Sequence, residues 1–434
     1  MKQITIFYLL IGVFWSVDTL ATDTHDSNGY SQTYMIGLDS ILTRAMNSSR
    51  ELKSAIKKHQ ATEILLDSEV AYYYPKVSLG GDFKKYYTGD GDSKENVSDI
   101  SLTVKSKIYG DAIHDKVAGA SDTERGAYYE IKSKENEIYY TVVSSLSKIE
   151  RSRLYIHSAA KLREEMLSYL ELLRQAIKQG VSPISDLKKA DLVIAKFDDD
   201  VFTEKSNIER YFYELEMATE IEILSPDDVG ISVDELHKLS SKVMDTFEKD
   251  KAITNNFKII SKEYNLSSLK HQALSQNENL KLSLINETYF NTVNNNDGAS
   301  FGQIKDTSYL GLRLDMVLFD DQRNKRDKAS YIQYLAEKDN LNAEKEKIKF
   351  EVELLHRNYR SLSSKITNID TQMNLSRKLI KSQKNDLWID RVTQQDLIAT
   401  LSSLNQEGLS LLALDLKVYE TIYKYWELKS EAIF

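Results

Sequence analysis

The spacing of hydrophobic residues changes twice in the first half of the chain, and each change predicts a different element. Residues 35–74 carry apolar side chains every three or four positions, which predicts a helix that ends at Pro75. Beyond it, apolar and polar residues alternate, which predicts a β-hairpin over 75–109 with one apolar and one polar face. Helical spacing then returns over 112–224. The first half is therefore predicted as helix, hairpin and helix.

The returning helical stretch is interrupted once. No proline occurs from 112 to 179, and Gly180 then breaks the pattern. Ser182 as N-cap and Pro183 at the first helical position favour a new helix, because the N–H that proline lacks has no partner in a first helical turn. We therefore expect two antiparallel helices joined at a tip near 180–186.

The second half of the chain repeats this order. Alternating positions predict a hairpin over 280–319, and helical spacing predicts a second helical pair over 322–430 with a tip near 386–396. Its first helix carries apolar residues spaced alternately by four and three, an unbroken heptad pattern that is typical of a coiled coil. These residues are Ile348, Val352, Leu355, Tyr359, Leu362, Ile366, Ile369 and Met373.

Two landmarks recur at one spacing. Asp186 recurs as Asp396 and Tyr109 as Phe319, since 396 − 186 and 319 − 109 both equal 210. Two separate landmarks at one offset indicate an internal duplication. We accordingly expect a first repeat over 22–230, a connector over 231–255 and a second repeat over 256–434.

The first 21 residues resemble a secretory signal. Lys2 supplies a positive charge, an apolar run follows over 4–17, and small residues at 19–21 suit cleavage, which assigns 1–21 as a signal peptide. The alternative is an N-terminal anchor helix, although a span needs about 20 apolar residues. The chain has 0 Cys, so neither disulfides nor a lipidated cysteine is expected.

Composition narrows the class of protein. The 434 residues include only 3 Pro and 16 Gly, which predicts long uninterrupted elements. The charged share of 28% and the hydrophobic share of 41% suit solvated helices packed along narrow apolar seams. The net charge of −9 argues against a nucleic-acid partner, because duplex binding needs a basic face.

Motifs for chemistry are scarce. The seven His never pair with one another at i, i+3 or i, i+4, and together with the lack of Cys this gives no signal for a transition-metal site. The loop 90–92 lacks the glutamate that closes a calcium loop, and the acidic run 198–200 is interpreted as a hydrated helix face. No nucleophile elbow or phosphate loop occurs. No catalytic, cofactor-binding or metal-binding residue is therefore predicted.

The two predicted hairpins restrict the kinds of assembly in which the chain can be stable. Four strands with an apolar outer face leave edge hydrogen bonds unmade, and such a face needs a partner sheet or lipid. In an exported chain without a spanning helix, closing a barrel with further copies satisfies both needs. Tyrosines near the strand ends suit the aromatic belts of such a barrel, and the alternative for each of them is ordinary packing.

Several segments together resemble the TolC family of outer-membrane ducts. They are the strand after Pro75, the strand-to-helix joints at 108–111 and 318–321, and the helix turn at 179–187. The resemblance covers nearly all of the mature chain and implies a mainly α fold with a transmembrane β contribution. It implies a homotrimer whose twelve-stranded β-barrel in the outer membrane continues as a periplasmic α-helical coiled-coil barrel.

The resemblance also assigns residues at the two tips. It implies adaptor docking by Gly180, Val181, Ser182, Asp390, Val392 and Thr393. It implies that Asp186 and Asp396 ring the aperture, where three copies would concentrate negative charge. The alternative is that an acid three residues after Thr393 only suits a helix N-terminus. Asp390 departs from the family pattern, in which glycine is usual at this position.

The function implied is that of an outer-membrane channel in a tripartite efflux pump or a type I secretion system. Such a passive duct docks to a periplasmic adaptor and an inner-membrane transporter, and it contacts outer-membrane lipid. The alternative hypothesis is a periplasmic adaptor or coiled-coil scaffold, which has a single helical hairpin beside compact β domains. An enzyme is the third hypothesis, and the lack of catalytic motifs argues against it.

Overall fold

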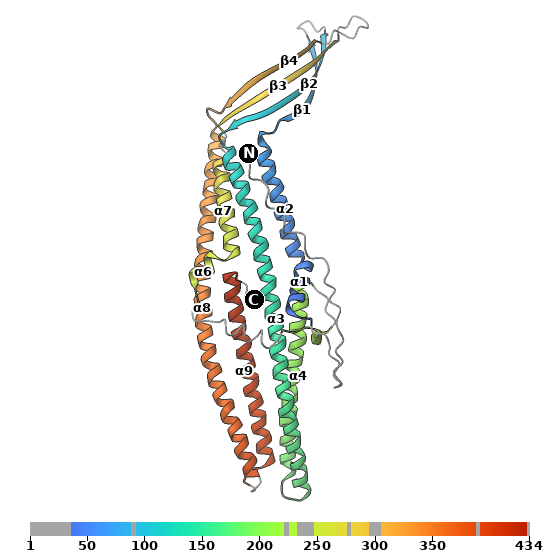
Figure 1. Ribbon diagram of the computed structural model, residues 1–434, viewed down its shortest axis with the longest axis vertical. Coiled ribbons are helices and arrows are strands. Elements are labelled where there is room, and N and C mark those ends of the chain that lie inside the picture. Colours follow the sequence, from blue (N-terminus) through green and yellow to red (C-terminus); the bar gives the residue numbers. More distant parts are fainter. Residues whose placement is uncertain are drawn as a thin grey trace, which may run out of the picture. The chain divides into compact units, whose positions relative to one another are not determined.

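A computed structural model describes residues 36–87, 93–220, 225–231, 247–275, 279–294, 305–387 and 391–431. The predicted signal peptide and Asp390 lie outside these residues. The main elements in chain order are α1 (Leu38–Ser48), α2 (Arg50–Val70), β1 (Lys76–Tyr87), β2 (Ser93–Gly110), α3 (Ile113–Lys178), α4 (Ile184–Thr219), α6 (Lys249–Thr254), α7 (Phe257–Ser275), β3 (Leu280–Asn294), β4 (Lys305–Met316), α8 (Asp321–Leu387) and α9 (Gln394–Lys429). Figure 1 traces this order by colour.

The helix predicted over 35–74 is in fact two helices. The backbone leaves helical geometry at Ser49, and the Ser49 hydroxyl accepts a hydrogen bond from the N–H of Leu52 at 3.2 Å. A serine side chain that satisfies a free N–H of a first turn begins a new helix. The apolar spacing did not reveal this break, because α1 and α2 keep their apolar residues on nearly the same face.

The four strands form one antiparallel sheet in the order β1-β2-β3-β4. The central pairing, β2 with β3, joins the two halves of the chain. Directly opposite residues share a face, and the register pairs Leu79 with Leu102 and Leu284 with Leu312. The other face is polar, and there Glu287 accepts hydrogen bonds from the hydroxyls of Thr103 and Tyr309. The predicted separation into an apolar and a polar face is therefore present.

The long helix α3 organises the helical part of the chain. It packs against α2 and α7 near the sheet and against α4 and α9 farther along (Figure 1). The contact with α7 is close: a Cβ added to Gly126 would lie 2.5 Å from Asn265 Oδ1, and the Ser261 hydroxyl donates to the Gly126 carbonyl at 2.7 Å. Glycine therefore permits this approach of the two helices.

Three hydrophobic clusters hold the helices together. One joins α1, α3, α4 and α9 around Leu146 and Leu215. A second joins α3, α4, α8 and α9 around Leu173 and Phe197, and a third joins α6, α7, α8 and α9 around Val352. Every residue of the predicted heptad pattern on α8, from Ile348 to Met373, is buried or half-buried. They form the seam by which α8 packs on its neighbours.

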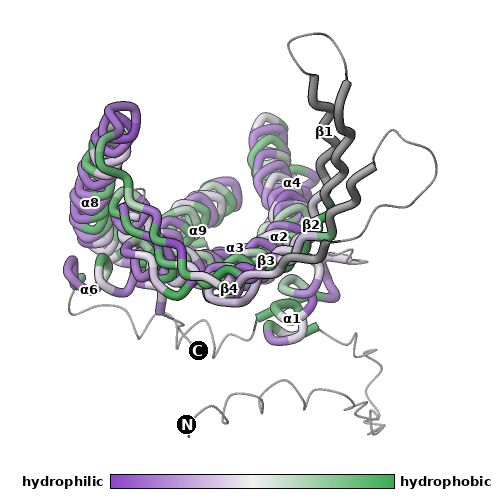
Figure 2. The backbone as a smooth tube through the Cα atoms, turned by 90° about the horizontal axis from the view of Figure 1, so that it is seen from above, coloured by the Kyte–Doolittle hydropathy of each residue, from purple (hydrophilic) through white to green (hydrophobic). Residues whose placement is uncertain are grey.

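Each long helix is amphipathic rather than uniformly apolar. Figure 2 shows hydrophobic and hydrophilic positions interleaved along α3, α4, α8 and α9. No helix among the described residues is both long and apolar enough to cross a membrane. The predicted fold class, mainly α with an added antiparallel sheet, is confirmed.

Candidate functional site

The first tip (180–186) begins with a Schellman motif at the end of α3. Gly180 has φ +74°, its N–H donates to the Ile177 carbonyl at 3.0 Å, and the Val181 N–H donates to the Ala176 carbonyl at 2.9 Å. These bonds satisfy two carbonyls that the helix end leaves free. Val181 then projects into solvent with 70% of its surface exposed. A large apolar residue is thus displayed at the turn.

The second helix of this hairpin starts one residue later than predicted. Pro183, not Ser182, is the N-cap of α4, and it lies in an extended conformation at φ −76° and ψ 149°. The prediction of Ser182 as N-cap was therefore wrong. Because the backbone of Pro183 is itself extended, the helix begins at Ile184 and Ser182 stays in the turn. Ser182 is half-buried there.

Asp186 lies in the first turn of α4. Its side chain is only 15% exposed, and Oδ1 lies 3.5 Å from the ammonium of Lys189 on the same helix. Its backbone N–H donates to the Pro183 carbonyl at 3.1 Å. An acid at this position is favoured by the free N–H groups of the helix start. The structure thus gives Asp186 a local partner and a favourable position at the helix terminus.

In the second tip (386–396) the structure describes 386–387 and 391–396, so Asp390 lies outside the described residues. Thr393 and Asp396 form a capping box at the start of α9. The Asp396 N–H donates to the Thr393 hydroxyl at 3.2 Å, and the Thr393 N–H donates to Asp396 Oδ2 at 3.2 Å. Both residues are nevertheless exposed, and Val392 is half-buried. Asp396 therefore caps the helix and also presents charge to solvent.

The two tips lie at the same end of the helical hairpins, opposite the sheet (Figure 1). The second hydrophobic cluster contains Leu187 beside the first tip and Leu397 beside the second. A hydrogen-bonded ion pair between Lys384 on α8 and Glu165 on α3 spans the two hairpins, and this carboxylate raises the pKa of Lys384. The structure therefore brings together the two predicted tips, which are 210 residues apart in the sequence.

The acidic run 198–200 is more than a hydrated helix face. Asp198 accepts two hydrogen bonds from Arg163 on α3, Nε to Oδ1 at 2.6 Å and Nη2 to Oδ2 at 2.9 Å. Hydrogen bonding to this guanidinium lowers the pKa of Asp198. Asp200 accepts from Gln406 on α9, while partial burial raises its pKa. Only Asp199 matches the prediction, because its neighbours bond across to other helices.

The sheet presents a broad apolar surface. On β4, Leu310, Leu312 and Leu314 are 69%, 67% and 62% exposed, and Leu79 on β1 is 74% exposed. Beyond β4, Phe319 is 83% exposed. Soluble proteins rarely expose a contiguous apolar surface of this kind without covering it. The face matches what lipid or a hydrophobic partner covers.

Solved bacterial outer-membrane proteins share this fold. The outer membrane protein VceC of Vibrio cholerae matches with a TM-score of 0.71 at 12% identity, over 92% of this chain and 97% of that chain. The CmeC outer membrane channel of Campylobacter jejuni matches with a TM-score of 0.69 at 12% identity, over 91% and 85%. The open state of the MtrE outer membrane channel of Neisseria gonorrhoeae gives 0.69 at 12% identity, over 91% and 89%.

No family model and no curated protein matches the chain by sequence. The structural similarity nevertheless covers 91–92% of this chain and 85–97% of the three outer-membrane proteins. It confirms the predicted arrangement of long paired helices and β-hairpins. Two of these three proteins, CmeC and MtrE, are outer membrane channels.

Proposed function

We propose that this protein is an outer-membrane channel, a passive duct that completes an efflux pump or a type I secretion system. Three copies assemble, each giving β1 to β4 to a twelve-stranded barrel in the outer membrane. The paired long helices of the three copies continue the barrel as a tube in the periplasm. The observation that carries the proposal is the exposed apolar face of a four-stranded sheet in a chain with the fold of outer-membrane channels.

The sheet itself supports closure with further copies. Among the described residues, β1 and β4 are its two edges, and each edge leaves backbone groups that a neighbouring strand can pair with. A barrel removes such edges, and lipid tolerates backbone only when its hydrogen bonds are made within the protein. With β1 of one copy beside β4 of the next, the apolar face points to lipid and the polar face lines the duct.

The helices carry surfaces that suit contacts between copies. On α4, Phe202 and Met217 are 70% and 64% exposed, and on α8, Phe350 and Ile332 are 70% and 64% exposed. These residues lie outside the seams that hold the protomer together. Large aromatic and aliphatic residues of this kind favour burial in an interface. The proposal places them between neighbouring copies of the helical tube.

The two tips form the periplasmic end in this proposal. Gly180, Val181 and Ser182 on the first tip and Val392 and Thr393 on the second, with Asp390, are the proposed surface for an adaptor protein. Exposure of Val181 supports this role, because an adaptor helix needs apolar side chains to pack on. Asp396 and Asp186 are the proposed acids of the aperture, and an inner-membrane transporter supplies the energy.

The absence of cysteine makes assembly directly testable. Ser78→Cys on edge strand β1 is combined in turn with Gly311→Cys, Arg313→Cys and Asp315→Cys on edge strand β4, all on the polar face. Oxidation in isolated outer membranes is expected to give a disulfide-linked species of three chains for at least one pair. Each single-cysteine variant is the matched control and should give at most a linked pair. Only monomers with every pair would contradict the proposal.

A further inference from the structure

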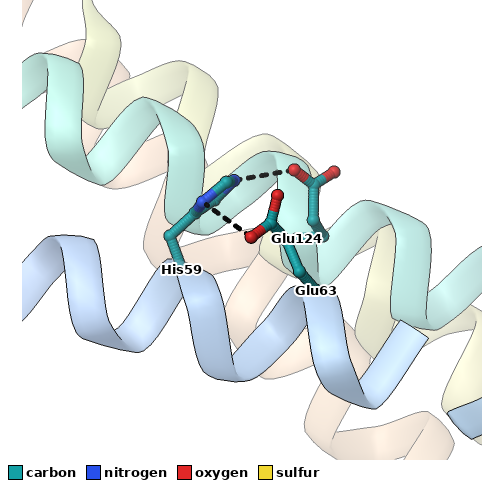
Figure 3. Close-up of side chains that lie close together, drawn as sticks. All are labelled: His59, Glu63 and Glu124. Atoms are coloured by element: carbon teal, nitrogen blue, oxygen red, sulfur yellow. Dashed lines mark hydrogen bonds and ion pairs between the residues drawn. The ribbon is translucent and has the colours of Figure 1, made fainter. Parts of the chain in front are cut away.

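Three side chains from two helices converge near the start of α3. His59 and Glu63 lie four residues apart on α2, so they share one face of that helix, and Glu124 faces them from α3. Figure 3 shows the three side chains pointing toward one another. His59 Nε2 lies 2.7 Å from Glu124 Oε1, and His59 Nδ1 lies 3.9 Å from Glu63 Oε2. One nitrogen and two carboxylate oxygens lie within 4.8 Å of one another.

From this geometry we propose that His59, Glu63 and Glu124 form a binding site for a zinc-type divalent cation between α2 and α3. Zinc binds imidazole nitrogen and carboxylate oxygen at about 2.0–2.2 Å, so three ligands already within 4.8 Å need only small side-chain rotations to converge. Water completes the coordination on the exposed side, where Glu63 is 56% accessible.

The charges of the cluster favour a cation. Two carboxylates meet at one imidazole, and no lysine or arginine ion-pairs with either carboxylate among the residues that the structure describes. Even with a protonated imidazole, the cluster carries a net negative charge. His59 and Glu124 are also largely shielded, with side chains 16% and 23% exposed, which strengthens the electrostatic interaction. A divalent cation neutralises both carboxylates and leaves the imidazole neutral.

The ligand set also selects the class of cation. Imidazole suits zinc, copper and nickel, whereas calcium and magnesium prefer oxygen ligands throughout. The pattern of the seven histidines could not reveal the site, because the third ligand is 65 residues from His59 and two of the three are glutamates.

A second histidine provides a matched comparison. His271 on α7 also lies between two carboxylates of α3, with Nδ1 2.9 Å from Asp115 Oδ1 and Nε2 3.9 Å from Asp122 Oδ2. These two aspartates are two helical turns apart, about 10 Å along the axis. Among the described residues, only His59, Glu63 and Glu124 offer three ligand atoms within 4.8 Å of one another, and His271 with its two aspartates does not. His271 is expected to link α7 to α3 without binding a metal.

Isothermal titration of the full chain in detergent with Zn²⁺ alone tests the proposal. We expect one strong site per chain, retained in His271→Gln. His59→Gln is expected to raise the dissociation constant at least about 100-fold, since losing even an outer hydrogen-bond partner of a ligand costs about 10- to 100-fold. Excess Ca²⁺ is expected not to compete. Equal Zn²⁺ affinity in His59→Gln and His271→Gln, or the lack of a stoichiometric site in the unmodified chain, overturns the proposal.

Glu63→Gln keeps the test decisive if His59→Gln does not fold. The Glu63 side chain is half-exposed, so the change removes a ligand charge with little loss of packing. Its helical circular dichroism is expected to match that of the unmodified chain, while its Zn²⁺ affinity falls at least about tenfold. Unchanged Zn²⁺ affinity in folded Glu63→Gln overturns the proposal. The titration does not depend on channel activity, so its outcome is separate from that of the duct.

Discussion

Thr393 and Asp396 cap each other at the start of α9. Each side chain accepts the backbone N–H of the other at 3.2 Å, and the Thr393 hydroxyl also donates to Asp396 Oδ2 at 2.7 Å. Asp396 is the residue proposed to ring the aperture, so one side chain carries a structural role that is observed and a functional role that is proposed. Suitable substitutions separate the two.

Asp396→Asn removes the charge and keeps an oxygen that can accept the Thr393 N–H, whereas Thr393→Ala breaks the cap and keeps the charge. We expect Asp396→Asn to reduce the cation preference of the channel, because three charges leave the aperture. Thr393→Ala should leave that preference unchanged and cost about 1 kcal/mol of stability. Ion selectivity from reversal potentials in planar bilayers measures the first effect. Unchanged selectivity in Asp396→Asn would remove Asp396 from the aperture.

Gly180→Ala tests the turn of the first tip. Gly180 has φ +74°, and a Cβ added there would meet no neighbouring atom within 4 Å, so the cost is purely conformational. We expect a loss of about 1–2 kcal/mol, seen as a lower thermal midpoint of the helical circular dichroism signal. Gly408→Ala is the control, because Gly408 lies inside α9 and its added Cβ would make an ordinary contact with Tyr155 of α3 at 3.8 Å. That change should stabilise by about 0.5–1 kcal/mol.

The neighbouring acids Asp198 and Asp200 should respond oppositely to pH. The Arg163 hydrogen bonds lower the pKa of Asp198, so its stabilisation is complete above the ordinary aspartate pKa of about 3.9 and is lost as the pH falls through the lowered value. Asp198→Asn should therefore lower the melting midpoint at pH 7 and have no effect in strong acid. Because both partners are about 40% exposed, the effect should stay below about 1 kcal/mol.

For Asp200 the sign reverses. Burial raises its pKa, so its ionised form destabilises the fold as the pH rises through that value. Asp200→Asn keeps an oxygen for Gln406 and should leave stability at pH 7 unchanged or slightly higher. Melting curves at neutral and acid pH compare the two variants. A larger loss for Asp200→Asn than for Asp198→Asn at pH 7 would show the assignments to be wrong.

Two phenylalanines on α4 distinguish the core of the protomer from the proposed interface. Phe197 is fully buried in the cluster beneath the tips, so Phe197→Ala should cost about 3–5 kcal/mol. Phe202 is 70% exposed, and Phe202→Ala should leave the helical content unchanged but weaken association of the three copies. Circular dichroism and native mass spectrometry measure these outcomes. Fully retained trimers in Phe202→Ala would place Phe202 outside the interface.

The sequence predicted the elements better than it predicted their ends and their contacts. Alternation and helical spacing are local patterns, and they placed the hairpins and the long helices α3, α4, α8 and α9 within a few residues. The break at Ser49 and the N-cap at Pro183 depend on single hydrogen bonds and dihedral angles, which apolar spacing does not record.

The sequence did not predict the side-chain contacts between helices that are far apart along the chain. Arg163 and Asp198 are 35 residues apart, and His59 and Glu124 are 65 apart, so no local motif unites either pair. The spacing of His59 and Glu63, at i and i+4, was a visible sign of a shared face, but pairs of histidines alone do not detect a site with two glutamate ligands. The structure supplies the third residue by packing α3 against α2.

Conductance of the purified protein in planar lipid bilayers tests the central proposal most directly. A trimeric duct predicts discrete, stepwise increases in current when detergent-solubilised protein is added. The current steps of Asp396→Asn are expected to be smaller and less cation-selective than those of the unmodified chain. The matched control is protein cross-linked through Ser78→Cys and a β4 cysteine, which should conduct as well as the unlinked form. A protein that leaves washed membranes without detergent as a monomer and produces no current steps would contradict the account.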